Sequence, residues 1–357
     1  MSASSNTKEL DLNGLVVENL RKYFGETRAV RRVSFSVEPR EVVAILGPSG
    51  CGKSTVLHLI AGLETPDQGS VRWNEKSMTE VPPHQRNFGL MFQEYALFPH
   101  MNVAENISFG LRMKGVAKAR VEARLREVLE LVELPQFGTR SIDELSGGER
   151  QRIALARTLA PEPELIMLDE PLGSLDRTLK ERLMLELPQI LRRTNQTVLY
   201  VTHDQEEAFA VADRVVVMRQ GEVVQVGSPE SIYRSPNTTF VAQFLGLDNL
   251  VEAHAHRTDA GSIVNSPVGQ LELPESHSGR ITLLIRPEAA SLQDEGGLEI
   301  LGEVLEKSFR GSSQRVVLQT DTKAKLSFDF NATHHLPDIG QIISVFVPVP
   351  AGFQVLP

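Results

Sequence analysis

The chain has 357 residues, of which 41% are hydrophobic, and its formal net charge is −9 at pH 7. This length can hold two domains with separate cores, and the acidic balance argues against a protein that binds nucleic acid. The first residues lack the apolar core of a signal peptide, and no run of about 18 apolar residues predicts a membrane span. The single cysteine, Cys51, excludes an internal disulfide and fits a reducing cytoplasm. Any membrane role is therefore expected to come through a partner.

Short apolar runs alternate with longer helical patterns over the first 250 or so residues, which predicts an α/β fold with a largely parallel sheet. The runs at 42–46, 165–168 and 198–201 are apolar throughout, as expected of strands that are covered on both faces. We predict a first domain over residues 13–245 and a second domain over residues 246–357.

The apolar run at 42–46 leads into a glycine-rich loop that matches the pattern Gly-x-x-x-x-Gly-Lys-Ser and precedes a helical run. Its glycines let backbone N–H groups converge on phosphate oxygens, and the following helix N-terminus adds positive potential. Lys53 supplies a mobile charge, and the hydroxyl of Ser54 is expected to bind Mg²⁺. We therefore predict that the phosphates of a nucleotide bind here. The predicted contact residues are Gly47, Pro48, Ser49, Gly50, Cys51, Gly52, Lys53, Ser54 and Thr55.

Gln93 follows a short predicted strand at 88–92, where its neutral amide can complete a magnesium shell without adding charge. A lone glutamine at a strand end is more often a surface or capping residue. The assignment therefore depends on the order and spacing of Gln93 relative to the other motifs.

A helical pattern follows, in which apolar residues recur at three- and four-residue spacing among arginines and glutamates. This spacing predicts one apolar helix face that packs on neighbouring helices, in a small helical subdomain inserted at about 100–160. The residues of this face are Val121, Leu125, Val128, Leu129 and Val132.

Ser146, Gly147 and Gly148 open the next predicted helix, at 149–159. A serine hydroxyl, two bare backbone N–H groups and a helix dipole form a second anion site. One γ-phosphate does not need two distant helix N-termini from the same subunit. The economical solution is a head-to-tail dimer in which ATP lies between the phosphate loop of one copy and the Ser-Gly-Gly segment of the other.

Two acids, Asp169 and Glu170, end the apolar run at 165–168. Asp169 can hold Mg²⁺ beside the phosphate loop, and Glu170 can orient or deprotonate the attacking water. The competing interpretation is that these acids cap the helix that begins after Pro171. His203 follows the run at 198–201 and can donate to γ-phosphate oxygens, although a lone histidine there is more often a surface residue.

Beyond about residue 251 the chain holds only short strand-like segments with frequent turn residues. This texture predicts a separate small β-barrel in the last hundred residues.

In this order the loop, Gln93, residues 145–149, the two acids, residues 174–176 and His203 resemble the ATP-binding cassette (ABC) ATPase family. The resemblance covers residues about 13 to 245 and implies an ATP-sandwich dimer. It also implies that Asp176 lies in the segment that couples the two sites across the interface. The family carries an aromatic residue that stacks on adenine; we assign it to Phe24, which precedes Gly25, with Tyr23 as the near alternative.

Two further segments resemble one branch of that family. Residues 93–106 resemble importer ATPases of the polyamine, ferric-iron and sugar group, and residues 285–288 resemble their regulatory domain of the oligonucleotide/oligosaccharide-binding (OB) fold. The resemblance implies a homodimer on the cytoplasmic face of the cell membrane, bound to integral membrane permease subunits and served indirectly by an external solute-binding protein. Ferric iron or polyamine is the favoured solute, with sugar, sulfate and thiamine open.

The chain departs from the family pattern at two places. Gly173 stands where many relatives have serine, and Pro188 is expected to bend or split the helical stretch at 179–193. The rival function is a soluble, non-transport ABC ATPase that acts on the ribosome or on DNA. A single cassette, the lack of a heptad tract and the acidic balance argue against that rival.

Overall fold

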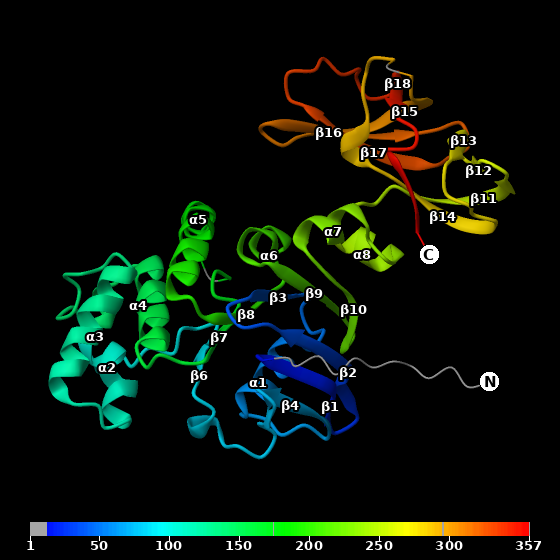
Figure 1. Cartoon of the computed structure of the whole chain (residues 1–357). Helices are drawn as coiled ribbons and strands as arrows, with labels where there is room; N and C mark the ends of the chain where they lie inside the picture. Colours follow the sequence, from blue (N-terminus) through cyan, green and yellow to red (C-terminus); the bar gives the residue numbers. More distant parts are fainter. Residues whose placement is uncertain (1–12, 174, 295, 357) are drawn as a thin grey trace, which may run out of the picture. The chain divides into compact units, whose positions relative to one another are not determined.

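The computed structural model describes residues 13–173, 175–294 and 296–356 (Figure 1). Within these residues, no helix is long and apolar enough to cross a membrane. The chain divides into a compact unit that ends at Glu230 and a second unit from Ser231 onward. The sequence predicted the division near residue 245, so the short helical segment before that position groups with the second unit.

A ten-stranded sheet forms the centre of the first unit, in the order β5-β4-β1-β2-β10-β9-β3-β8-β7-β6. The five strands from β9 to β6 run parallel, whereas β1, β2 and β4 pair antiparallel. β3, β7 and β8 are buried along their whole length, as their unbroken apolar sequences predicted. The strands are β1 (Leu15–Phe24), β2 (Thr27–Val37), β3 (Val42–Leu46), β4 (Gln68–Trp73), β5 (Lys76–Ser77), β6 (Phe88–Met91), β7 (Leu165–Asp169), β8 (Thr197–Thr202), β9 (Arg214–Arg219) and β10 (Glu222–Gly227).

Parallel pairing places the carboxyl ends of β3, β6, β7 and β8 at one edge of the sheet. The phosphate loop, Gln93, the two acids and His203 each follow one of these strands. Open α/β sheets bind their ligands at this edge.

Three helices of the first unit form a cluster with its own core. α2, α3 and α4 lie together in Figure 1 and share a hydrophobic core of their own, which confirms the predicted helical cluster. In α3, Val121, Val128 and Leu129 are buried and Leu125 is partly buried. α5 continues through Pro188 without interruption. The helices are α1 (Lys53–Ala61), α2 (Val103–Met113), α3 (Lys118–Leu131), α4 (Gly147–Leu159), α5 (Arg177–Thr194) and α6 (Gln205–Val211), with short 3₁₀ turns at Pro83–Gln85 and Ile142–Glu144, and α7 (Pro229–Arg234) spans the boundary between the two units.

The second unit is built on β-strands, in two sheets that share one hydrophobic core. Their orders are β13-β12-β11-β14-β19 and β17-β16-β15-β18, and this architecture confirms the predicted OB-like class. The elements are α8 (Thr239–Phe244), β11 (Leu250–Thr258), β12 (Gly261–Ser266), β13 (Gly269–Leu273), β14 (Gly279–Ile285), β15 (Leu298–Phe309), β16 (Ser313–Gln319), β17 (Lys325–Asn331), β18 (Ile342–Val347) and β19 (Phe353–Leu356), with a 3₁₀ turn at Pro287–Ala289.

Candidate active site

The loop between β3 and α1 wraps around the ammonium of Lys53. Its Nζ donates to the carbonyl oxygens of Gly47 (2.9 Å) and Pro48 (3.1 Å), and the residue is only 4% exposed. Gly52 precedes α1 with φ of 100°, a conformation that side chains with a Cβ rarely adopt. A Cβ there would also lie 2.4 Å from the carbonyl oxygen of Ala29. The loop therefore needs glycine at this position for both conformation and space.

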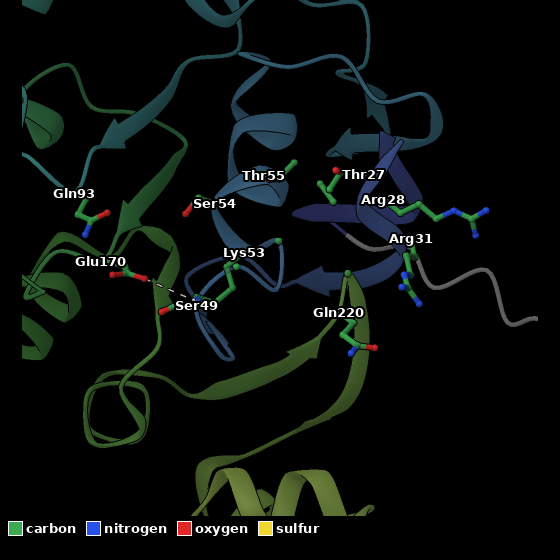
Figure 2. Close-up of a pocket in the computed structure, with 14 residues that line it drawn as sticks. Thr27, Arg28, Arg31, Ser49, Lys53, Ser54, Thr55, Gln93, Glu170 and Gln220 are labelled. Carbon is green, nitrogen blue, oxygen red and sulfur yellow. Dashed lines mark ion pairs between the residues drawn. The ribbon is translucent and has the colours of Figure 1, made fainter. Parts of the chain in front are cut away.

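The loop opens onto a pocket of about 600 Å³, shown in Figure 2. Ser54, Gln93 and Glu170 form one wall, and Lys53 lies between this wall and the opposite one. The opposite wall comes from β2 and from the turn between β9 and β10. The lining residues are Thr27, Arg28, Ala29, Arg31, Ser49, Gly50, Gly52, Lys53, Ser54, Thr55, Gln93, Glu170, Gln220 and Gly221.

Asp169 is the last residue of β7, and it lies behind the first wall. The Oγ of Ser54 donates to its Oδ1 at 3.1 Å, so the loop and the acid meet directly. Burial raises the pKa of the Asp169 carboxyl, and the hydrogen bond from Ser54 opposes that rise. The Ser54 hydroxyl and the Asp169 carboxylate together place oxygen atoms that could ligate a metal ion at the edge of the pocket.

Glu170 lies between a lysine and a histidine. Its Oε1 is 4.0 Å from Lys53 Nζ, and its Oε2 is 3.1 Å from His203 Nδ1. The backbone of Glu170 has φ of 44°, which is uncommon for a residue other than glycine and often occurs at functional sites. Lys53 and His203, which follow two different strands, thus converge on the carboxylate of Glu170, which follows a third.

Comparisons with known proteins decide the family. A family model described as ABC transporter matches residues 30–173. The chain is 47% identical over 324 residues to the Fe(3+) ions import ATP-binding protein FbpC of Streptomyces avermitilis, covering 90% of this chain and 92% of that relative. The chain belongs to the ABC transporter family. Two proteins named spermidine/putrescine import ATP-binding protein PotA are also similar: that of Clostridium acetobutylicum (39% over 295 residues; 83% and 84% covered) and that of Photobacterium profundum (37% over 359 residues; 98% and 96%).

This ABC protein is therefore an ATP-binding, ATP-hydrolysing subunit of the importer type. Gln93 and Glu170 line one pocket with most of the predicted loop residues, and His203 contacts Glu170. The lining loop residues are Ser49, Gly50, Gly52, Lys53, Ser54 and Thr55. Pro48 and Gly47 contact Lys53 rather than the pocket space itself. Cys51 is a buried residue of the loop, and burial raises the pKa of its thiol.

The Ser-Gly-Gly segment of this ABC protein does not line the pocket. Ser146 caps α4: its Oγ accepts from the N–H of Glu149, and the Glu149 carboxylate accepts from the N–H of Ser146 at 2.7 Å. A Cβ at Gly148 would lie 2.9 Å from a methyl group of Leu179, so glycine lets α4 pack closely on α5. Ser146 and Gly147 themselves are exposed.

Asp176 and Phe24 are also not among the residues that line the pocket. Asp176 caps α5 by accepting from the N–H of Leu179 at 3.1 Å, and its neighbour Ser174 lies outside the described residues. Phe24 ends β1 with 47% of its surface exposed, and Lys22 Nζ lies 5.2 Å from the centre of its ring. Phe24 pairs with Thr27, a residue that lines the pocket, at the end of the β1–β2 pairing.

Sequence reasoning did not identify the second wall. The turn residue Gly221 donates its N–H to the Cys51 carbonyl at 2.9 Å, and its own carbonyl accepts from the N–H of Arg31 at 2.9 Å. The turn thereby joins the phosphate loop to β2. A hairpin is foreseeable from Gln220-Gly221 between two apolar runs, but its contact with the loop depends on long-range pairing of β10 with β2.

Proposed function

We propose that the pocket binds ATP with Mg²⁺ and that hydrolysis there drives solute import. The observation that supports this most directly is the convergence of Lys53, Ser54 and Glu170 on one pocket at the carboxyl edge of the sheet. In such a site the loop N–H groups and Lys53 bind the phosphates. Phe24 is the proposed adenine platform.

Ser54, Gln93 and Asp169 are the proposed magnesium ligands. Their hydroxyl, amide and carboxylate oxygens are the hard donors that Mg²⁺ prefers, and the Ser54–Asp169 contact of 3.1 Å brings two of them together. When bound, the ion would neutralise charge on the phosphate oxygens.

Glu170 is the proposed base for the attacking water. As the water oxygen bonds to the γ-phosphorus, Glu170 accepts the water proton, the bond to the bridging oxygen breaks, and ADP leaves as phosphate forms. His203 donates a hydrogen bond to a γ-phosphate oxygen. Its contact with Glu170 at 3.1 Å keeps both side chains at the phosphate end of the pocket.

The remaining predicted residues require a second copy of the chain. Ser146, Gly147 and Gly148 of one copy are proposed to bind the γ-phosphate held by the loop of the other. Support comes from the exposure of Ser146 and Gly147 at the start of a 13-residue helix, which directs N–H groups outward. Asp176 is proposed to couple the two sites across this homodimer.

The proposed setting is an importer at the cytoplasmic face of the cell membrane, where the dimer binds permease subunits and an external binding protein delivers the solute. Ferric iron or a polyamine is the proposed solute, because the relatives are named as import proteins for Fe(3+) and for spermidine/putrescine. We propose residues 13–245 as the ATPase domain and 246–357 as a regulatory domain.

Purified full-length chain is expected to hydrolyse ATP, and chelation of Mg²⁺ is expected to stop it. Co-expression with the permease subunits is expected to yield a complex. Cells that lack this chain are expected to lose uptake of labelled ferric iron or of labelled spermidine. Magnesium-independent or absent hydrolysis would contradict the proposed reaction, and normal uptake of both solutes would contradict the proposed cargo.

A further inference from the structure

A carboxylate is buried behind the strand end that carries His203. Glu207, in α6, is 1% exposed. Its Oε2 accepts from the hydroxyl of Tyr200 at 2.9 Å and from that of Thr202 at 2.8 Å, and its Oε1 lies 2.6 Å from Lys180 Nζ. Both oxygens therefore have partners, as a buried charge requires. Tyr200 and Thr202 belong to β8, whose next residue is His203.

Lys180 connects this carboxylate to a different helix. It lies in α5, one turn after Asp176, and its Nζ is also 2.6 Å from Asp204 Oδ2. Asp204 follows His203, caps α6 by accepting from the N–H of Glu207 at 3.2 Å, and donates its own N–H to Thr202 Oγ1 at 3.0 Å. The segment on both sides of His203 is thus fixed to α5 through one ammonium.

The titration behaviour agrees with a charged network. Burial lowers the pKa of Lys180, but hydrogen bonds to Asp204 and Glu207 outweigh it and leave the pKa raised. Burial raises the pKa of Asp204, but the hydrogen bond and charge of Lys180, together with the backbone N–H groups of Glu206 and Glu207, outweigh burial and leave the pKa lowered. Burial, followed by the Glu207 charge, raises the pKa of Tyr200 well above its usual range. The lysine is therefore charged near neutral pH and Tyr200 stays a neutral donor.

We propose that Lys180 and Glu207 are positioning residues for hydrolysis, which hold His203 beside Glu170 and tie this arrangement to α5. Because Asp176 begins α5, the same pair connects the proposed dimer contact of Asp176 to the γ-phosphate end of the pocket. This inference rests on the proposed ATPase reaction. It assigns a function to a buried ionic network that touches no ligand itself.

The test uses full-length Glu207→Gln and Lys180→Met. Glu207→Gln keeps the side-chain shape, so folding is preserved, while Lys180 loses one of its two carboxylate partners. We expect kcat to fall about tenfold or more, as misplaced catalytic groups do. Nucleotide affinity is expected to stay within about twofold, because neither residue lines the pocket. Lys180→Arg is expected to keep most of the activity, since it retains the charge.

Two further variants separate positioning from general structural damage. Glu181→Gln breaks the exposed ion pair with Arg177 on the same helix and is expected to leave kcat unchanged. Adding Glu207→Gln to His203→Ala is expected to cause little further loss, because residues that act through one another are not additive. A wild-type kcat in folded Glu207→Gln, or a multiplicative loss in the double variant, would overturn the inference. An inactive wild-type chain would instead contradict the proposed reaction.

Discussion

Two helix N-termini of this chain carry glycine and a hydroxyl, yet their surroundings differ. At the start of α1, Lys53 and Ser54 lie in a pocket with Glu170, and a buried aspartate contacts the serine. At the start of α4, Ser146 and Gly147 are exposed, and no residue of the segment lines that pocket. The first terminus lies among acids and cations that line or adjoin the pocket, whereas the second carries its own capping box, with Arg140 Nη1 4.0 Å from Glu149 Oε1.

A chain can therefore carry every motif of the family without holding a complete site by itself. The loop, the acids and His203 converge because they end parallel neighbouring strands. The Ser-Gly-Gly segment instead begins a helix of the separate α2–α4 cluster. A second copy of the chain is the simplest source of the missing contact.

The largest effect is expected at the α1 side from Glu170→Gln. Loss of the proposed base should lower kcat by about a hundredfold or more while ATP still binds. Glu162→Gln is the matched control, since Glu162 also has positive φ (53°) but is exposed and does not line the pocket. Steady-state hydrolysis measures kcat and equilibrium binding measures ATP affinity for both variants. A near-normal kcat in Glu170→Gln would reject Glu170 as the base.

At the α4 side, Ser146→Arg should lower kcat by about a hundredfold, because it removes an anion donor and fills the proposed contact. ATP affinity of the single chain should change little. Ser141→Arg is the matched control, since Ser141 forms the same capping box with Glu144 at a 3₁₀ turn. Equal losses in both variants would show that capping, rather than the phosphate contact, matters.

A smaller effect is expected on the second wall of the pocket. Arg31→Gln should raise the KM for ATP about two- to fivefold, because it removes a cation that attracts the phosphates. The effect is modest because solvent screens this attraction. The difference should shrink at high salt. Arg32→Gln is the control, since successive strand residues face opposite sides and Arg32 donates to Asn19 at 3.2 Å. Identical KM values for the two variants would exclude this wall from the nucleotide site.

The smallest effect concerns stability and the raised pKa of Asp169. Between its usual value of 3.8 and its raised value, the folded chain holds the proton more tightly than the unfolded chain, so stability falls as pH rises. Asp169→Asn should therefore raise the melting temperature at neutral pH by about 2–4 °C. The gain should vanish as pH falls toward 4. A neutral-pH decrease in melting temperature would contradict this account.

The sequence predicted the parts of the site that depend on local pattern. Apolar strands followed by Lys53, Asp169 or His203 indicate residues at a sheet edge, because parallel strands share that edge. Arg31 and Gln220 were missed because their place depends on pairing between β2 and β10, which are far apart in the chain. Which residues of two distant strands pair cannot be predicted from local sequence pattern.

Pro188 was predicted to bend or split its helix, and α5 is not split there. Buried leucine and isoleucine side chains on both sides of the proline pack α5 against the unit, which compensates for one lost backbone hydrogen bond. The buried residues are Leu183, Leu187, Ile190 and Leu191. Tertiary packing therefore outweighed a local signal.

If a second copy of the chain completes the site, the mass of the protein in solution should depend on ATP. Light scattering on Glu170→Gln with ATP and Mg²⁺ should give a mass of twice the 39.5 kDa of one chain. Adding Ser146→Arg should return the mass to that of a single chain. A Glu170→Gln, Ser146→Arg double variant that dimerises with ATP as fully as Glu170→Gln alone would contradict completion of the site by a second copy.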